Sequence, residues 1–380
     1  MTIVELGDVA EIIAGQSPPG NTYNGDRIGL PFFQGKAEFG GVHPQPVKWC
    51  SAPTKIAVAG DILISVRAPV GPTNIASEKC CIGRGLAAIR PDERIALRGY
   101  VHWAVIAARP LLESKGNGST FAAINRSDLT SLRIPLPPLD EQRRIMSLLD
   151  RAAEIRRRAD AARAKARAII PALFLNMFGD PATNPKGWPV VTVGDLLESA
   201  TYGTSQKAND RGDGIPMIRM GNVTIGGQLD TADLKHIDIA GDEREKAELF
   251  EGDLLFNRTN SKELVGKTGL WDGRFEAVAA SYFIRLRVMN ALCTPSYVWA
   301  FFNTQYMKQA LFATARGAIG QANINAKELR AFRVAVPPLD LQTSFAEQAK
   351  RLEATARALD VAAAKAEAMA AALSAEVFGP

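Results

Sequence analysis

The residue types that most often bind metals or act as nucleophiles are few in this sequence and do not cluster. The three histidines lack the H-E-x-x-H spacing that places two zinc ligands on one helix face, and the four cysteines form no C-x-x-C pair. These residues are His43, His102, His236, Cys50, Cys80, Cys81 and Cys293. The pattern therefore predicts no metal site, and we interpret the cysteines as reduced thiols.

Three short segments resemble parts of catalytic motifs but lack essential residues. Gly266-Lys267-Thr268 matches the end of a phosphate-binding loop, but Ser261 stands where its first glycine is required. Gly83-x-Gly85-x-x-Ala88 resembles a dinucleotide fingerprint, but no β-α-β unit surrounds it, so a glycine-bearing strand is the simpler interpretation. Asn184-Pro185-Lys186-Gly187 fails the N/D-P-P-F/Y motif of DNA methyltransferases at its third position. The sequence therefore predicts no catalytic residue and no cofactor on this chain.

The composition is that of an ordinary globular protein. Of 380 residues, 47% are hydrophobic and 22% are charged, which excludes a collagen-like, a disordered or a membrane-embedded class. No apolar run approaches the roughly 20 residues of a membrane span, and no basic leader with an apolar stretch opens the sequence. We therefore expect a cytoplasmic protein of two or more domains. A net charge of +5 is too small to indicate the class of partner.

A long internal repeat dominates the sequence. The stretch LRIPLPPLDEQ at 132–142 recurs at 332–342 as FRVAVPPLDLQ, and Ile124-Asn125 recurs as Ile324-Asn325 with the same offset of 200. The length of the repeat is too great for a solenoid and indicates that one domain-plus-helix unit has been duplicated. Looser matches upstream are residues 4–9 with 191–196, Pro31 with Pro216, and 60–64 with 252–256.

Each copy is predicted to have a mixed front and a helical back. In the fronts, short β-rich runs alternate with Gly, Pro and Asn turns and with helical patches at about 98–113 and 295–315. Paired prolines precede the backs, where proline suits the first turn of a helix but not its interior. The expected fold class is α+β, with two pseudo-repeated globular domains separated by two long α-helices. The predicted divisions are 1–138, 139–180, 181–338 and 339–380.

Apolar residues recur at steps of three and four through both backs, which is the spacing of a helix–helix contact. The first stripe is Ile145, Leu148, Ala152, Ile155, Ala159, Ala162, Ala166, Ile169 and Leu173. The second is Phe345, Ala349, Leu352, Ala356, Leu359, Ala363, Ala366, Ala370 and Leu373.

Residues that keep the same phase in both stripes are the candidates for packing the two helices on each other, and an antiparallel coiled-coil pair is the simplest arrangement. They are Ile145, Ala152, Ala159, Ala166 and Leu173 in the first helix, and Phe345, Leu352, Leu359, Ala366 and Leu373 in the second. The open alternative is that each helix packs on its own globular domain. Pro171 is expected to end or kink the first helix, leaving 31 residues from Asp140 to Ile170.

With these features together, the chain resembles the DNA-specificity subunit of type I restriction-modification systems over nearly its whole length. The resemblance rests on the repeated I-N-x-x-x-L and P-P-L-D lead into each helix, on the crossing segment at 173–188, and on the G-D-I-L-I-S strand at 60–65. Gly118-Ser119-Thr120-Phe121 resembles the recognition-domain signature of the family. The second copy departs from that signature at residues 317–323.

The resemblance implies a function and a set of partners. Members of the family use two target recognition domains to read the two halves of a bipartite double-stranded DNA sequence, while the helix pair spaces the domains and docks two methyltransferase subunits. S-adenosylmethionine then belongs to the methyltransferase, and ATP and Mg²⁺ belong to a restriction subunit where one is present. The specificity chain itself has no active site.

Base edges are read by side chains with paired hydrogen-bond donors and acceptors, which predicts DNA contacts from polar loop clusters. In the first domain the candidates are Gln16, Ser17, Gln34, Lys36, Arg67, Thr73, Asn74, Ser119 and Thr120. In the second they are Ser205, Gln206, Lys207, Arg219, Asn222, Asn257, Arg258, Thr259, Asn260, Lys262, Gln321 and Asn323. The segment 257–262 is the leading candidate, because four polar residues after an apolar strand suggest an exposed loop tip.

Two alternative functions remain open from the sequence. The chain could be a stand-alone two-domain DNA-binding or regulatory protein without methyltransferase partners, or a nuclease with scattered carboxylates. The arginines of the first helix, such as Arg156 and Arg163, are also ambiguous. They fit a solvated outer face, a docking surface or attraction toward phosphate.

Overall fold

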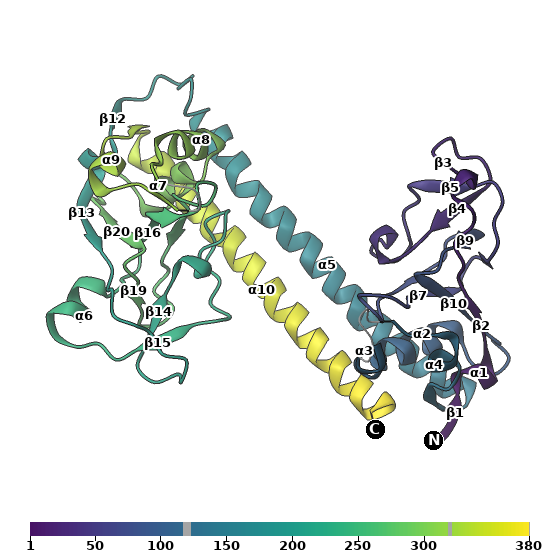
Figure 1. The fold of residues 1–380 in the computed structure, drawn as a ribbon. Helices are drawn as coiled ribbons and strands as arrows, with labels where there is room; N and C mark the ends of the chain where they lie inside the picture. The colour runs from purple at the N-terminus through teal and green to yellow at the C-terminus, as the bar shows by residue number, and fades with distance from the viewer. Residues whose placement is uncertain (117–122, 318–320, 380) are drawn as a thin grey trace. The chain divides into compact units, whose positions relative to one another are not determined.

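A computed structural model describes residues 1–116, 123–317 and 321–379, which form two compact units (Figure 1). The first unit comprises Met1–Asp160 and Val361–Pro380, and the second comprises Ala161–Asp360. Each unit therefore contains one globular part and one half of each long helix. Within the described ranges, none of the helices is long and apolar enough to cross a membrane.

The first unit is built mainly from antiparallel strands. One sheet has the order β2 (Ala10–Ala14), β10 (Leu86–Pro91), β7 (Ile62–Ser65), β8 (Thr73–Ile75). Another has the order β3 (Tyr23–Asn24), β5 (Lys48–Cys50), β4 (Leu30–Phe33), β9 (Cys80–Ile82), β6 (Ile56–Ala57), with β4 and β9 parallel. A third pairs β1 (Thr2–Glu5) with β11 (Arg133–Leu136). The short helices are α1 (Leu6–Val9), α2 (Arg98–Ala107), α3 (Arg109–Gly116) and α4 (Arg126–Thr130).

The second unit repeats this plan. Its four-stranded sheet has the order β13 (Leu197–Tyr202), β20 (Phe283–Val288), β16 (Leu254–Asn257), β18 (Thr268–Leu270). A second sheet has the order β15 (Lys235–Ile237), β14 (Ile215–Ile218), β19 (Val278–Ala279), with β14 and β19 parallel. Two pairs are β12 (Val190–Thr192) with β22 (Arg333–Ala335), and β17 (Thr259–Asn260) with β21 (Ala322–Asn323). The short helices are α6 (Gly241–Ala247), α7 (Pro295–Phe302), α8 (Gln305–Thr314) and α9 (Ala326–Arg330).

The sequence repeat is therefore a repeat of structure. The looser upstream matches also fall on equivalent strands. Pro31 lies in β4, which pairs in parallel with β9, and Pro216 lies in β14, which pairs in parallel with β19. Residues 62–64 lie in β7 and residues 254–256 in β16. The predicted α+β class with two pseudo-repeated globular parts is confirmed.

The repeated I-N-x-x-x-L motif forms the start of a short helix in each unit. The Asn125 side chain accepts hydrogen bonds from the backbone N–H groups of Ser127 and Asp128, and the Asp128 carboxylate accepts one from the Asn125 N–H. Asn325 and Glu328 form the same reciprocal cap on α9. Asparagine is a preferred residue here because its side chain satisfies N–H groups that have no partner in the first turn. The Ile and Leu of the motif are buried in both units.

A buried glutamine joins each long helix to its globular part. Gln142 accepts a hydrogen bond from the Leu97 N–H at 2.8 Å and donates to the carbonyls of Ile95 and Pro137. Gln342 makes the same three contacts, with the Thr294 N–H and the carbonyls of Leu292 and Pro337. Both glutamine side chains are completely shielded from solvent. The PPLDEQ and PPLDLQ sequences thus encode a hydrogen-bonded joint between globule and helix.

The two long helices, α5 (Leu139–Phe178) and α10 (Leu339–Phe378), pack antiparallel within each unit. In the first unit the start of α5 contacts the end of α10, because Ile145 and Leu149 form a cluster with Val377 and Leu373. In the second unit the end of α5 contacts the start of α10 through Phe174 and Phe345, whose ring centroids are 5.9 Å apart. The clusters also include Tyr100 and Tyr297, so each helix packs on a globular part as well as on the other helix.

The ten residues predicted to pack the helices are all buried or half-buried, but three further members of the first stripe were placed wrongly. Leu148, Ile155 and Ile169 are 41–47% exposed, whereas Leu149 and Ile170 are buried. The buried positions of α5 follow the phase of α10, and two arginines stand in that phase, the exposed Arg156 and the half-buried Arg163. Arg156 pairs with Glu367 in the first unit, and Arg163 pairs with Asp360 at 2.6 Å in the second. Because the pattern counted only apolar residues, it placed these three positions of the first stripe one residue too early.

The expectation that Pro171 could end the first helix is also corrected, because α5 continues through it to Phe178 and is 40 residues long. A proline inside a helix removes one backbone hydrogen bond and costs about 3 kcal/mol. In this case the turn that follows carries Phe174 and Phe178, which are buried against Tyr297 and Phe345. Burial of each phenylalanine is worth about 1.5–3 kcal/mol, which is enough to keep the last turns helical.

We expect the Gln342→Leu variant to lower the free energy of unfolding by about 2 kcal/mol or more, because it leaves buried peptide groups without partners. Urea denaturation followed by tryptophan fluorescence measures the change. Gln348→Leu on the exposed face of the same helix is the control and should stay within about 0.5 kcal/mol of the parent. Equal stability of both variants would contradict the role of the glutamine joint.

Candidate functional site

The ends of four strands converge on one turn in the first unit, where the turn at residues 83–85 joins β9 to β10. Five backbone hydrogen bonds hold this arrangement. With the N–H donor first, they are Gly15 to Leu86 (2.9 Å), Gln16 to Ile82 (3.0 Å), Gly83 to Phe33 (2.8 Å), Val66 to Gly85 (3.0 Å) and Ile124 to Val66 (2.9 Å). The residues that follow β2, β4 and β7 are thereby gathered at one edge of the unit.

The second unit contains the same five hydrogen bonds at equivalent positions. They are Gly203 to Phe283 (3.4 Å), Thr204 to Ala279 (2.9 Å), Ala280 to Ile218 (3.0 Å), Arg258 to Tyr282 (2.9 Å) and Ile324 to Arg258 (3.0 Å). We call the side chains displayed at these edges the strand-end surfaces. They comprise Gln16, Ser17, Gln34, Arg67 and Arg84 in the first unit, and Tyr202, Ser205, Arg219, Arg258 and Tyr282 in the second.

Glycine permits this close approach of backbones. A Cβ atom on Gly15 would lie 2.2 Å from the Gly83 carbonyl oxygen, and one on Gly203 would lie 2.2 Å from that of Ala279. A Cβ on Gly85 would likewise meet the Gln34 carbonyl oxygen at 2.2 Å. The Gly83-x-Gly85 pattern therefore packs strand ends together. The exposed Arg84 lies between these two glycines, and the sequence analysis did not include it among the candidates for DNA contact.

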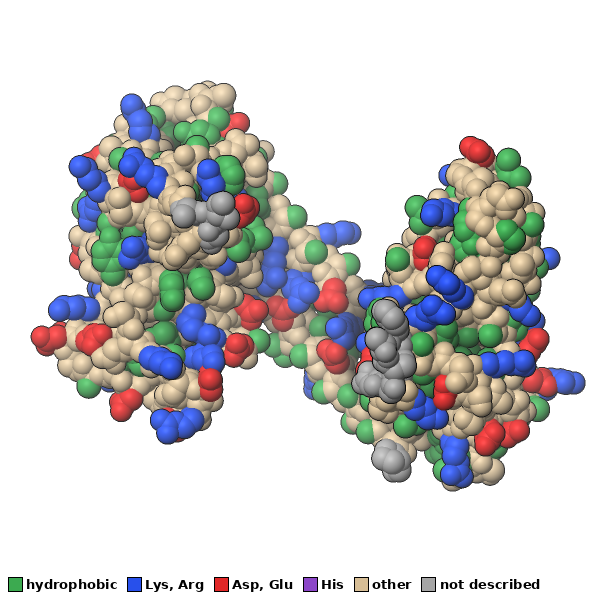
Figure 2. All heavy atoms as spheres, viewed as in Figure 1, with side chains coloured by type: hydrophobic (Ala, Val, Ile, Leu, Met, Phe, Trp, Pro, Cys, Tyr) green, Lys and Arg blue, Asp and Glu red, His purple; other side chains and the backbone are tan. Residues whose placement is uncertain are grey.

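Four of the predicted residues of the first unit are exposed on or beside this edge. Gln34 follows directly after β4, and Gln16 and Arg67 lie two residues beyond the ends of β2 and β7. Lys36 begins the turn beyond Gln34. Ser17 is half-buried, and its hydroxyl accepts a hydrogen bond from the Arg84 N–H at 3.4 Å. A group of basic side chains lies over the region of β7 on the visible face of this unit (Figure 2).

Two further candidates, Thr73 and Asn74, form hydrogen bonds within the protein. The Thr73 hydroxyl lies 2.9 Å from Nε2 of His102, and burial lowers the pKa of His102 to about 4. Asn74 is 4% exposed and donates to the Gly40 carbonyl at 3.1 Å. These contacts explain why two polar residues occur in β8 without facing solvent. Two further candidates, Ser119 and Thr120, lie outside the described residues.

The strand-end surface of the second unit carries aromatic side chains. The Arg258 guanidinium lies over the Tyr202 ring, 4.8 Å from its centroid, and Tyr202 is 45% exposed. Tyr282, in the turn before β20, is 43% exposed and was missed by the sequence analysis, because a single tyrosine in a turn gives no pattern. The half-buried Arg219 follows β14 and contacts Asp233 at 3.4 Å.

The neighbouring segment at 205–207 is only partly free. Ser205 and Lys207 are exposed. Gln206 donates a hydrogen bond to Glu243 of α6, and the same carboxylate accepts one from the Thr204 hydroxyl at 2.8 Å. Gln206 is therefore tied to the protein rather than free to reach a ligand.

The expected loop tip at 257–262 is contradicted at its first residue. Asn257 is completely buried, because it ends β16 and donates to the carbonyls of Thr259 and Tyr282 while accepting from Asn260. The Thr259 hydroxyl donates to the side chain of Asn323 at 2.6 Å, since β17 pairs with β21.

The polar residues after β16 therefore stabilise the pairing of β17 with β21, and they do not form an exposed loop tip. In the remainder of this group, Lys262 and Gln321 are exposed, and the Lys262 ammonium lies 4.6 Å from the Phe312 ring centroid. Asn222 is 5% exposed and bonds to the Arg219 N–H and to two backbone carbonyls. Asn222 is therefore a structural residue.

The exposed members of both surfaces are polar side chains that can all donate hydrogen bonds. Arginine donors can bind guanine edges in pairs, glutamine can pair with adenine, and either can contact phosphate. Across the described parts of the chain, no three or more His, Cys, Asp or Glu side chains are grouped so that they could hold a metal ion. The arrangement is suited to recognition of an anionic, hydrogen-bonding surface.

Comparison with known proteins gives a consistent result. The family described as Type I restriction modification DNA specificity domain matches residues 1–157 and 185–360. A putative type I restriction enzyme MjaX specificity subunit of Methanocaldococcus jannaschii is 45% identical over 178 residues, covering 46% of this chain and 42% of that protein. The type I restriction enzyme EcoKI specificity subunit of Escherichia coli K12 is 25% identical over 301 residues, covering 74% of this chain and 64% of that protein. The chain thus spans less than two thirds of either relative.

A solved structure shares the fold. The type I restriction-modification system S subunit from M. genitalium aligns over 99% of this chain and 96% of that chain, with a TM-score of 0.67. The sequence identity in this alignment is 13%, so the similarity concerns the fold alone.

We expect Asn257→Ala to lower the free energy of unfolding by about 1–3 kcal/mol, because it removes the hydrogen bonds that the buried Asn257 side chain donates to the Thr259 and Tyr282 carbonyls. Lys262→Ala, five residues later and exposed, should lower it by only about 0.5 kcal/mol, because it loses the exposed contact with the Phe312 ring and no buried hydrogen bond. Urea unfolding of the two variants in parallel tests this assignment. The opposite order of effects would return the segment to the list of ligand-contacting loops.

Proposed function

Because the chain belongs to the type I restriction modification DNA specificity family, we propose that it reads a bipartite sequence in double-stranded DNA for a type I restriction-modification complex. The observation that supports this most strongly is the duplicated strand-end arrangement, in which the same five backbone hydrogen bonds display different side chains in the two units. Equivalent scaffolds with different donors are what two unequal half-sites require. Each unit reads one half-site through its strand-end surface.

The two surfaces favour different modes of reading. The first unit offers Arg84 between two glycines, so its backbone can come close to a groove while the guanidinium binds a guanine edge. The second unit offers Arg258 stacked on Tyr202, with Tyr282 nearby. A guanidinium held on an aromatic face loses less freedom on binding, and an exposed tyrosine can stack on a base.

Catalysis resides on partner subunits in this proposal. Two methyltransferase subunits hold S-adenosylmethionine, and a restriction subunit, where one exists, uses ATP and Mg²⁺. The chain positions the methyltransferase over a target adenine, which must leave the base stack before its amino group can react. A stand-alone DNA-binding protein is the alternative, and it has no observation in its favour.

Co-expression with the methyltransferase subunit of the same system tests the proposal. A stable complex that methylates adenine at one bipartite sequence, found by sequencing modified DNA from the host, is the expected result. DNA binding with no association with the methyltransferase would support the stand-alone protein. Mg²⁺-dependent cleavage by this chain alone would support the nuclease.

We predict that Arg84→Ala and Arg258→Ala alter different half-sites. Loss of a paired contact to a base costs about 1–3 kcal/mol, which corresponds to roughly 5- to 150-fold weaker binding. Binding selection from randomised DNA should show relaxed preference at one position of one half-site for Arg84→Ala, and of the other half-site for Arg258→Ala. Arg94→Ala, whose side chain is 89% exposed beyond the opposite end of β10, is the control. A uniform loss for all sequences would assign the residue to phosphate contact.

The helix pair should act as a ruler between the half-sites. Removal of residues 157–163 from α5 and 360–366 from α10 deletes one heptad from each helix; it removes the Arg163–Asp360 pair and keeps the Arg156–Glu367 pair. Seven residues of helix span about 10 Å, which equals about three base pairs. The preferred spacer in the DNA should shorten by about that amount or binding should be lost, and an unchanged spacer would refute the ruler.

A further inference from the structure

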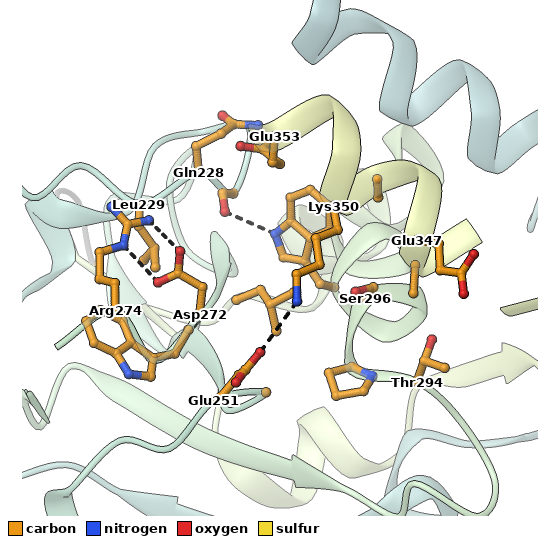
Figure 3. Close-up of a pocket in the computed structure, with 18 of the residues that line it drawn as sticks. Gln228, Leu229, Glu251, Asp272, Arg274, Thr294, Ser296, Glu347, Lys350 and Glu353 are labelled. Atoms are coloured by element: carbon orange, nitrogen blue, oxygen red, sulfur yellow. Dashed lines mark hydrogen bonds and ion pairs between the residues drawn. The ribbon is translucent and has the colours of Figure 1, made fainter. Parts of the chain in front are cut away.

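A cavity of about 580 Å³ opens in the second unit between α10, the start of α7 and the turns next to β16 and β18. Trp299, Leu270, Ala346 and Ala349 contribute apolar lining, and charged side chains stand around them. Figure 3 shows Lys350 and Glu353 on α10, with Asp272 and Arg274 across the cavity from them.

The first unit shows why this space is open. The Gln142 and Gln342 joints align Leu97 with Thr294, so Arg98 corresponds to Pro295 and Gly99 to Ser296. In the first unit the Arg98 guanidinium packs against Gly60, where it occupies the space that a Cβ atom would need. The Met146 thioether packs against Gly99 in the same way. Met146 corresponds to Ala346. The second unit therefore lacks both the guanidinium and the thioether that occupy this place in the first.

The cavity of the second unit also contains an acid with unused hydrogen-bonding capacity. Oε1 of Glu353 is buried and, within the described part of the chain, has no hydrogen-bond partner. The nearby guanidiniums of Arg274 and Arg357 both pair with Asp272. Alanine, Ala153, holds the corresponding position in the first unit.

The charges that face Glu353 do not balance its burial. Burial raises the pKa of its carboxyl group, although Arg167 of α5, Arg357 of α10 and Arg274 lower it, and Asp360 raises it further. The ionised carboxylate is therefore destabilised in this place. A cation entering the cavity would supply the missing donor and relieve that cost.

We propose that this cavity binds the guanidinium of an arginine side chain presented by a protein partner. The apolar walls would cover the methylene stem, and Glu353 would accept hydrogen bonds from the planar head, as charge-assisted pairs of this kind do. The site is independent of the strand-end surfaces. The partner's guanidinium would fill the place that the Arg98 guanidinium fills in the first unit.

Titration of the full chain with n-butylguanidinium at pH 7.5 tests the chemistry. Saturable change in tryptophan fluorescence is expected, with a Kd in the millimolar range for a ligand of this size. The neutral analogue n-butylurea should bind at least tenfold more weakly. No response to n-butylguanidinium up to 50 mM (about ten times the expected Kd), or equal binding of the two compounds, would overturn the proposal.

Two variants locate the binding. Glu353→Gln keeps the shape of the cavity and should weaken n-butylguanidinium binding at least tenfold. Ala346→Met should fill the cavity as Met146 does and abolish binding, whereas Ala354→Met on the exposed face of α10 should not. Thermal unfolding verifies that each variant is folded. Unchanged binding in Glu353→Gln would refute the role of this carboxylate.

A peptide comparison tests the source of the guanidinium. Acetyl-Leu-Arg-Leu-amide should bind more tightly than n-butylguanidinium and should compete with it, while the same peptide with citrulline should not. If the small cation binds but the peptide does not, the cavity is a site for a small molecule and the protein partner is refuted. None of these measurements involves DNA, so their failure is distinct from failure of the proposed function.

Discussion

The buried glutamine at the start of each long helix is the interaction on which the rest of this structure depends. Gln142 and Gln342 each join three backbone groups of a globular part to the first turn of a helix. A carboxamide can do this because it both donates and accepts, and because it is shielded from competing water. The orientation of each strand-end surface relative to the helix half in its own unit follows from this joint.

The two units share the residues that backbone geometry requires, and they differ in the side chains that face outward. The Asn caps, the glutamine joints and the glycine pair Gly15 and Gly203 recur because each satisfies peptide groups or permits close backbone contact. The side chains of the strand-end surfaces carry no such duty. Arg84 and its counterpart Ser281, or Gly85 and Tyr282, differ without disturbing the hydrogen bonds beneath them.

The sequence was sufficient for the features that repeat and insufficient for those that depend on partners across space. The domain-plus-helix plan and the looser match of Pro31 with Pro216 could be predicted, since both copies carry the pattern. Asn257 could not, because its burial depends on β17 pairing with β21, a contact between residues more than 60 positions apart. The first helical stripe failed for a related reason: Arg156 and Arg163 form ion pairs with α10, and a pattern of apolar residues does not detect such positions.

These two arginines also show how the helix pair is specified. Ion pairs that are more than one third exposed contribute about 0–1 kcal/mol each, which is small beside the burial of Phe174, Phe178 and Phe345. The aromatic cluster therefore supplies most of the stability of the pair in the second unit. Direction and register are a different matter. Arg156 and Arg163 are one heptad apart, as are Asp360 and Glu367, so both arginines meet an acid in the observed antiparallel register, and these ion pairs help to set that register.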